Sequence, residues 1–246
     1  MGELIAVLSG KGGTGKTSVC AGIATALAEQ GKKVLCIDCD VGLRNLDISL
    51  GLTDSGALSF LDVAEGNYPL DRAARHPTYL SLSFLTAPMH TAAHEIDPGI
   101  FEKLLSQARR DFEYVFLDAP AGVDAGFQLV SQFADRFLVV TGAGPAAIRD
   151  AARVSDLLEL MGKKNIRLIV NRVDREMLST TKITVDDVMD SAGLPLMGIV
   201  LEDPNVTLAA AFGKPLLCYA RRCTAAKAYR KIARRIQGFH EPITLR

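Results

Sequence analysis

The chain has 246 residues, of which 48% are hydrophobic and 23% charged, with 28 basic and 28 acidic side chains. This is the composition of a globular protein large enough to bury a core without disulfide bonds. A net charge of zero gives no general attraction for nucleic acid, so no nucleic-acid partner is expected. No stretch reaches the roughly 18 apolar residues that a membrane span needs. We expect a single domain over residues 1–246.

Apolar runs and helical patterns alternate along the chain. Seven runs predict strands, at residues 4–8, 33–37, 80–85, 114–117, 136–141, 166–170 and 196–201. Most are apolar throughout, which is typical of parallel strands covered on both faces. Helices are predicted at residues 16–30, 99–110, 146–161, 184–192 and 224–237, with two shorter ones at 59–65 and 69–75. The alternation predicts a doubly wound, mostly parallel α/β sheet.

A glycine-rich loop follows the first predicted strand and opens the first predicted helix. Residues 10–17, GKGGTGKT, fit the phosphate-loop pattern G-x-x-x-x-G-K-[ST] in the context that this motif requires. Backbone N–H groups of such a loop surround phosphate oxygens at a helix N-terminus. Lys16 is expected to reach the β- and γ-phosphates, and Thr17 to ligate Mg²⁺. The predicted nucleotide site comprises Gly10, Lys11, Gly12, Gly13, Thr14, Gly15, Lys16, Thr17 and Ser18.

Lys11 is a second cation in this loop, where an ordinary phosphate loop needs none. From the pattern alone it is either a solvated lysine or a group that stabilises transition-state charge, as an arginine finger does. The segment KGGTGKT resembles the deviant Walker A motif of the MinD/ParA superfamily, whose members are P-loop ATPases. This resemblance implies that Lys11 reaches across an ATP-sandwiched homodimer to the phosphates of the partner. Thr14 stands where many members carry valine, at a variable position.

Two carboxylates, Asp38 and Asp40, follow the second strand, and the carboxyl ends of strands are where open α/β sheets place ligands. Residues 38–47 resemble the first switch of the MinD branch without a gap. The resemblance implies that Asp40 ligates Mg²⁺ and supports hydrolysis together with Lys11 and Lys16. Asp38 is expected to hold the phosphate loop or a Mg²⁺-bound water.

The rest of this switch carries three polar residues. The resemblance places Asn45 near the active site of the partner subunit. Arg44 and Asp47 are interpreted instead as a surface ion pair.

The strand YVFLD ends in Asp118, a Walker B pattern whose carboxylate holds Mg²⁺ through water. Pro120 and Gly122 then predict a turn whose backbone could sense the γ-phosphate. The sequence DAPAG resembles the second switch of the MinD branch more than the D-x-P-P of ParA proteins. Asp150, further along, is either an interface residue or an ordinary helix-surface charge.

Base recognition is predicted where two later strands end. Asn171 can offer both a donor and an acceptor to a purine edge, and the resemblance implies that it contacts adenine, with Arg172 beside it. Residues 198–217 also resemble the MinD branch, which implies that Asp203 and Pro204 flank the base. The guanine-reading motif N-K-x-D is not present at Asn171, so ATP and ADP with Mg²⁺ are the expected cofactors.

The last predicted helix has an apolar stripe, at residues 225, 229, 232 and 236, opposite a basic face. We interpret it as docking on the sheet, with Gly238 ending it. The C-terminal amphipathic anchor that is usual in the MinD branch is not evident in the remaining FHEPITLR. A membrane surface stays open as a partner, besides the homodimer and a regulator protein that activates hydrolysis. The expected location is the cytoplasm or the inner face of the cell membrane.

The five cysteines support a reducing compartment, because they are odd in number and scattered without a secretory segment. Related scaffold proteins use cysteine pairs to bridge iron–sulfur clusters. Cys36, however, falls in an expected buried strand, which favours a structural thiol for it and for Cys39.

The resemblance implies a slow ATPase switch in spatial regulation, such as placement of the division septum. Three alternatives stay open. A flagellar-number regulator usually has an N-terminal extension, which is not expected here because the first strand begins near residue 4. A ParA-like partition protein would need a basic patch for DNA. A metabolic P-loop enzyme would need a separate substrate pocket.

Overall fold

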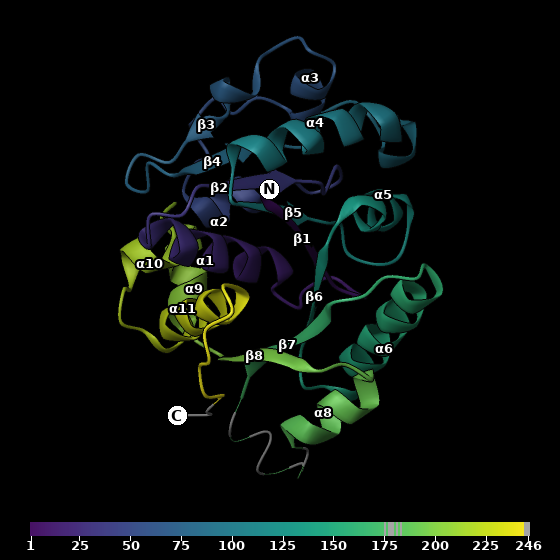
Figure 1. The fold of residues 1–246 in the computed structure, drawn as a ribbon. Helices are drawn as coiled ribbons and strands as arrows, with labels where there is room; N and C mark the ends of the chain where they lie inside the picture. The colour runs from purple at the N-terminus through teal and green to yellow at the C-terminus, as the bar shows by residue number, and fades with distance from the viewer. Residues whose placement is uncertain (175, 177–179, 181, 183, 244–246) are drawn as a thin grey trace.

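The computed structural model describes residues 1–174, 176, 180, 182 and 184–243, and its core is an eight-stranded sheet (Figure 1). The strands are β1 (Glu3–Leu8), β2 (Val34–Asp38), β3 (Ala74–Arg75), β4 (Leu82–Leu85), β5 (Tyr114–Asp118), β6 (Arg136–Thr141), β7 (Ile166–Val173) and β8 (Leu196–Leu201). Their order in the sheet is β3-β4-β2-β5-β1-β6-β7-β8, and every pairing is parallel except that of β3 with β4. The predicted doubly wound, mostly parallel α/β fold is confirmed.

Helices cover both faces of this sheet (Figure 1). On one face lie α1 (Lys16–Glu29), α2 (Leu46–Leu50), α9 (Pro204–Ala211), α10 (Leu216–Tyr219) and α11 (Thr224–Ile236). On the other lie α3 (Phe60–Ala64), α4 (Pro98–Asp111), α5 (Ala125–Phe133), α6 (Pro145–Leu160) and α8 (Val185–Ala192). Both apolar layers draw on alternate residues of the same strands, which explains why the strands are apolar throughout. None of the described helices is long and apolar enough to cross a membrane.

The parallel pairing brings the carboxyl ends of the central strands to one edge of the sheet. Asp38 at the end of β2 is in register with Asp118 at the end of β5, and Val7 of β1 is in register with Asp118 from the other side. The phosphate loop leaves β1 at this same edge and enters α1. The sheet therefore gathers the loop and the acidic residues that are far apart in sequence.

Several local predictions differ from the structure. The helix predicted at 69–75 is only a 3₁₀ turn at Leu70–Arg72, followed by β3, because the chain there pairs with β4 instead. α2, α5, α9 and α10 were not predicted as helices. All four are short, with 5, 9, 8 and 4 residues, so their apolar periodicity is weak in the sequence.

The C-terminal helix docks as predicted. The apolar stripe of α11, at residues 225, 229, 232 and 236, is buried against the sheet and α1. Its basic face is only partly solvated, since Arg230 binds Glu29 of α1 at 2.6 Å. Residues 237–243 are not helical, and the last three residues of the expected tail lie outside the described part of the chain.

α1 and α11 approach closely at Gly22, where a Cβ atom would lie 2.2 Å from the ring of Tyr229. We expect Gly22→Ala to lower the free energy of unfolding by about 1–3 kcal/mol, because an added methyl group overpacks a fully buried contact. Urea denaturation measures the change. The double variant Gly22→Ala/Tyr229→Ala should lose less than the sum of the two single variants, because removing the ring removes the clash. Strict additivity would contradict this explanation.

Candidate functional site

The phosphate loop forms an open cradle at the N-terminus of α1. Gly13 and Gly15 have φ angles of 80° and 81°, in the left-handed region that favours glycine. A Cβ atom on Gly12 or Gly13 would meet nothing within 4 Å, so the loop is open on this side. An open glycine-rich loop at a helix N-terminus is a typical phosphate site.

Two other glycines of the loop are required for a different reason. A Cβ atom on Gly10 would lie 2.5 Å from the carbonyl oxygen of Asp150, and one on Gly15 would lie 2.3 Å from the amide nitrogen of Asn171. These glycines therefore let the loop pack closely against α6 and against the end of β7. The motif alone does not distinguish this packing role from phosphate contact.

Lys16 and Asp118 form a buried ion pair beneath the cradle, with 2.5 Å between the Lys16 Nζ and the Asp118 Oδ1. Burial alone would lower the pKa of the Lys16 ammonium. The charge of Asp118 and its hydrogen bond outweigh burial, with Asp40 adding a smaller effect, so the pKa of Lys16 is raised. Lys16 is therefore a full positive charge held at the base of the loop.

The residues present also fit a magnesium ion. The second oxygen of Asp118, Oδ2, is buried without a hydrogen-bond partner, and a buried carboxylate oxygen is costly to leave unpaired. The Thr17 hydroxyl lies 3.5 Å from the same Lys16 Nζ that binds Asp118. Carboxylate and hydroxyl oxygens next to a phosphate cradle are the ligand types that Mg²⁺ takes with a nucleotide.

Asp40 lies in the loop after β2, half-buried at the edge of the cradle. Its Oδ1 accepts hydrogen bonds of 3.2 Å from the backbone N–H groups of Gly42 and Leu43. Asp40 thus shapes the turn that follows it, and its charge is near enough to contribute to the raised pKa of Lys16.

The Asp38 carboxylate holds the loop that follows β2 through backbone hydrogen bonds. Its two carboxylate oxygens accept from the backbone N–H groups of Asp40, at 2.9 Å, and Leu46, at 3.2 Å. Burial first, and then the charge of Asp118, raise the pKa of Asp38 to about 7, although these N–H groups oppose the shift. Its described contacts hold the acidic loop and the start of α2, whereas the sequence suggested the phosphate loop or a metal-bound water.

The expected surface ion pair between Arg44 and Asp47 is wrong. The Arg44 guanidinium instead donates two hydrogen bonds to the hydroxyl of Thr86, at 2.9 and 3.2 Å. The Asp47 carboxylate accepts from the backbone N–H of Ile48. Arg44 has a φ of 45°, in the left-handed region that few residues other than glycine adopt.

The Lys11 side chain points toward α6. Its ammonium is 4.0 Å from the Asp150 carboxylate of α6, and the two side chains are 44% and 39% exposed. A contact this long and this solvated contributes little to stability, so Lys11 can leave it readily. Asp150 is the carboxylate that faces Lys11 in the structure.

The turn after β5 is tied to the phosphate loop. Gly122 donates its backbone N–H to the carbonyl of Ser9 at 2.9 Å and has a φ of 92°. Pro120 packs against Gly126, where a Cβ atom would lie 2.3 Å away. A ligand in the cradle can therefore act on this turn through a direct backbone contact.

A cavity of about 160 Å³ lies beside the phosphate loop, between the ends of β7 and β8 and α9. Gly15 and Ser18 border it on the loop side, and Asn171, Arg172 and Asp203 border it on the strand side. Five residues assigned to the nucleotide from the sequence thus line one cavity. Val200, Val206 and Tyr229 add an apolar wall that suits a flat base.

Three of these residues also have structural contacts. The Asn171 amide nitrogen donates to the Thr14 carbonyl at 2.8 Å, and Arg172 donates to the Gly13 carbonyl at 3.2 Å. The Asp203 carboxylate caps α9 and accepts the Ala225 N–H of α11 at 3.0 Å. These contacts hold the loop and two helices around the cavity.

Pro204 does not border this cavity; it is the first residue of α9 and fixes the start of that helix. Val206, Thr207 and Tyr229 were missed in the sequence reasoning. The first two lie in the first turn of α9, so a helix prediction at 204–211 would have brought them to this cavity.

Comparison with known proteins agrees with this geometry. A family model described as the CobQ/CobB/MinD/ParA nucleotide binding domain matches residues 5–216. The septum site-determining protein MinD of Synechocystis sp. is 37% identical over 97% of this chain and 90% of its own. Among solved structures, the MinC:MinD cell division protein complex of Aquifex aeolicus matches with a TM-score of 0.90 and 37% identity, covering 98% of both chains. MinD of Pyrococcus horikoshii complexed with Mg-ADP matches with a TM-score of 0.83 and 28% identity, covering 96% of both chains.

Proposed function

Because the chain belongs to the CobQ/CobB/MinD/ParA nucleotide-binding family, we propose that it is a MinD-like ATPase switch that places the division site. In this proposal one P-loop domain dimerises around ATP and Mg²⁺, and hydrolysis separates the dimer. The observation that carries it is the position of Lys11, which stands half-exposed at the rim of a cradle already supplied with Lys16. The Lys11 ammonium, exposed at the rim, is available to the nucleotide of a second copy of the protein.

Each residue of the cradle has a role in this proposal. The N–H groups around Gly12 and Gly13 hold the phosphates, and Lys16 exchanges Asp118 for the β- and γ-phosphate oxygens. Thr17 and Asp118 hold Mg²⁺, with Asp40 supporting them; the ion neutralises charge that develops on the phosphates. Asn171, Arg172 and the backbone around Asp203 surround adenine.

Hydrolysis is slow in the isolated protein in this proposal. Asp40 is the one carboxylate at the rim that we assign to a water-orienting role, and its Oδ1 is bound to two backbone N–H groups. A regulator protein that reshapes this loop would free it. The solved MinC:MinD complex supports a protein partner for this class of chain. The proposed location is the cytoplasm, with peripheral association at the inner face of the cell membrane.

Measuring the solution mass tests the switch. Light scattering after size exclusion, with Mg-ADP and with Mg-ATP, should show a monomer with ADP and a dimer with ATP. Asp40→Ala should hold the dimer longer, because its ATP is hydrolysed more slowly. A protein that binds Mg-ATP, hydrolyses it and stays monomeric would contradict the proposal and favour a metabolic P-loop enzyme.

The base cavity gives a separate prediction. Asn171→Ala should weaken ADP binding about tenfold, because one hydrogen bond to the loop and one to the base are lost, at roughly 0.5–1.5 kcal/mol each. Isothermal titration with ADP and GDP measures both the affinity and the preference for adenine, which should fall. Asn67→Ala, at an exposed turn, is the control. An unchanged preference would remove Asn171 from base recognition.

A further inference from the structure

The end of β7 carries an arginine in an unusual backbone conformation. Arg172 has a φ of 55°, which is left-handed and rare for a residue with a side chain. The pairing of β7 with β8 is irregular at this point, with a register shift between Val170 and Val173. A left-handed residue costs free energy and persists only where its surroundings hold it, and such residues cluster at functional sites.

Two contacts hold the Arg172 side chain. Its Nε and Nη2 donate to the two carboxylate oxygens of Glu202, at 2.9 and 3.4 Å. Its Nη1 donates to the Gly13 carbonyl of the phosphate loop at 3.2 Å. The neighbouring Asn171 donates to the carbonyl of Thr14, the next residue of that loop. The planar guanidinium, with its fixed fork of donors, therefore joins the turn after β8 to the phosphate loop.

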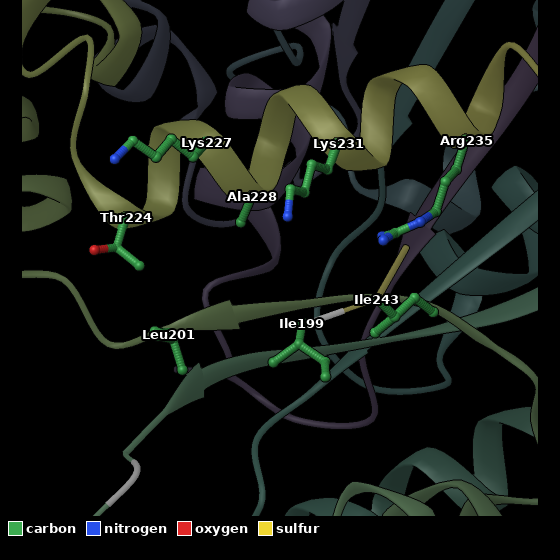
Figure 2. Close-up of a pocket in the computed structure, with 8 residues that line it drawn as sticks. All are labelled: Ile199, Leu201, Thr224, Lys227, Ala228, Lys231, Arg235 and Ile243. Atoms are coloured by element: carbon green, nitrogen blue, oxygen red, sulfur yellow. The ribbon is translucent and has the colours of Figure 1, made fainter. Parts of the chain in front are cut away.

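The backbone of Glu202 is held from two sides. Its N–H donates to the Val173 carbonyl at 3.0 Å, and the next residue, Asp203, accepts a backbone N–H of α11 at 3.0 Å. α11 lies along β8, and Figure 2 shows its first residue, Thr224, on the same groove as Leu201, the last residue of the strand. The sheet and α11 together fix the turn from which the Glu202 carboxylate reaches Arg172.

Stability does not explain this arrangement. The Arg172 and Glu202 side chains are 58% and 46% exposed, and ion pairs this solvated contribute little to the free energy of unfolding. Both residues instead line the cavity beside the phosphate loop, together with the buried Asn171, Asp203 and Tyr229. The exposed pair therefore lies at the rim of the cavity, where it can act on a bound nucleotide.

We propose that Glu202 is a positioning residue of the nucleotide site. Its carboxylate holds the Arg172 guanidinium where that group binds the Gly13 carbonyl, so the phosphate loop and the turn after β8 stay closed around the nucleotide. This role rests on the proposed function, because the ligand that the two segments enclose is its adenine nucleotide. Breaking the pair should let the nucleotide leave faster.

The direction of the effect separates positioning from simple electrostatics. The Glu202 carboxylate lies beside a site for an anionic ligand, so removal of its charge alone would strengthen the binding of ADP. If Glu202 positions Arg172, the same substitution loosens the phosphate loop and weakens the binding of ADP. The two explanations thus predict opposite changes in the rate at which ADP leaves.

The test measures ADP release by stopped-flow fluorescence, with N-methylanthraniloyl-ADP and Mg²⁺ displaced by excess ADP. Glu202→Gln is compared with Glu113→Gln, which breaks a similarly exposed ion pair with Lys32, before β2 and β5 and away from the cradle. We expect Glu202→Gln to release the nucleotide about fivefold faster, the upper range for an exposed ion pair, and Glu113→Gln to match the wild type. In urea denaturation without nucleotide, the two variants should have equal midpoints.

A double variant tests whether the two side chains act as one unit. Arg172→Lys keeps the charge but loses the fork that reaches both partners, so it should also release ADP faster. Arg172→Lys/Glu202→Gln should release it no faster than the faster single variant, because all three lose the same hold on Gly13.

Three results would overturn the positioning role and leave the proposed function intact. They are unchanged or slower release in Glu202→Gln, effects that add in the double variant, and a lower urea midpoint for Glu202→Gln than for Glu113→Gln, which would make the pair structural. A wild-type protein that binds no ADP would overturn the proposed function and this role with it.

Discussion

Lys11→Ala is expected to reduce ATP hydrolysis by about 100-fold or more while leaving the affinity for ADP within about twofold. The structure separates the two effects, because Lys16 lies buried beneath the cradle, whereas Lys11 lies half-exposed at its rim against Asp150. A charge delivered in trans to the transferring phosphate contributes several orders of magnitude to the rate in comparable systems. Single-turnover hydrolysis and ADP titration measure the two quantities.

A mixing experiment shows on which molecule Lys11 acts. Asp40→Ala retains Lys11, and Lys11→Ala retains Asp40, so a mixed dimer has one complete site if Lys11 crosses the interface. Mixing the two inactive variants should then restore part of the hydrolysis rate. If Lys11 acts on its own nucleotide, the mixture will be no more active than the sum of its components.

Asp150 provides the matched control for this prediction. Its contact with Lys11 is 4.0 Å long and solvated, so Asp150→Asn should leave both the stability and the affinity for ADP almost unchanged. A loss of ADP affinity in Asp150→Asn would show that the pair supports the cradle itself. The expected deficit of Lys11→Ala would then be structural rather than catalytic.

The sequence predicts the fold and the phosphate-binding part of the site well, because both follow from residues that are close together in the chain. Apolar strands and the GKGGTGKT loop are contiguous, and the parallel sheet then brings Asp118 beneath Lys16 without further information. The second partner of a long-range contact is harder to predict. No pattern around Arg44 indicates that its guanidinium binds Thr86, 42 residues away.

The glycines of the phosphate loop show the same limit of prediction from sequence. All four glycines belong to the same phosphate loop, yet the structure gives them two functions. Gly12 and Gly13 leave the cradle open, whereas Gly10 and Gly15 admit the neighbouring Asp150 backbone and the Asn171 side chain. The motif predicts that glycine is required at a position. Only the structure shows whether the reason is an open ligand site or a closely packed neighbour.

Asp118→Asn is expected to have opposite effects on stability and on metal-free nucleotide binding. The substitution removes the counter-charge of Lys16 and leaves a buried ammonium unpaired, which costs about 3–5 kcal/mol in other buried pairs. We therefore expect the nucleotide-free variant to lose about 3 kcal/mol of unfolding free energy in urea denaturation. Hydrolysis of Mg-ATP should fall by at least about 100-fold, because Asp118 is the proposed holder of the ion.

Without Mg²⁺, however, the same variant should bind ADP more tightly than the wild type. In the wild type Lys16 must give up Asp118 to reach a phosphate, and the carboxylate then repels that phosphate across a short distance. In Asp118→Asn the lysine has no other anion, so the nucleotide restores the missing counter-charge. ADP in excess EDTA should consequently stabilise the variant by more than it stabilises the wild type.

The double variant Lys16→Met/Asp118→Asn separates charge from packing. It removes both charges while keeping similar volumes, so much of the lost stability should return, as expected when a buried ion pair is replaced by uncharged groups. Binding of ADP should be absent with or without Mg²⁺, since no cation remains at the base of the cradle. If the double variant is instead less stable than Asp118→Asn, the ion pair is not the source of the single variant's loss. The buried pair would then be a packing element.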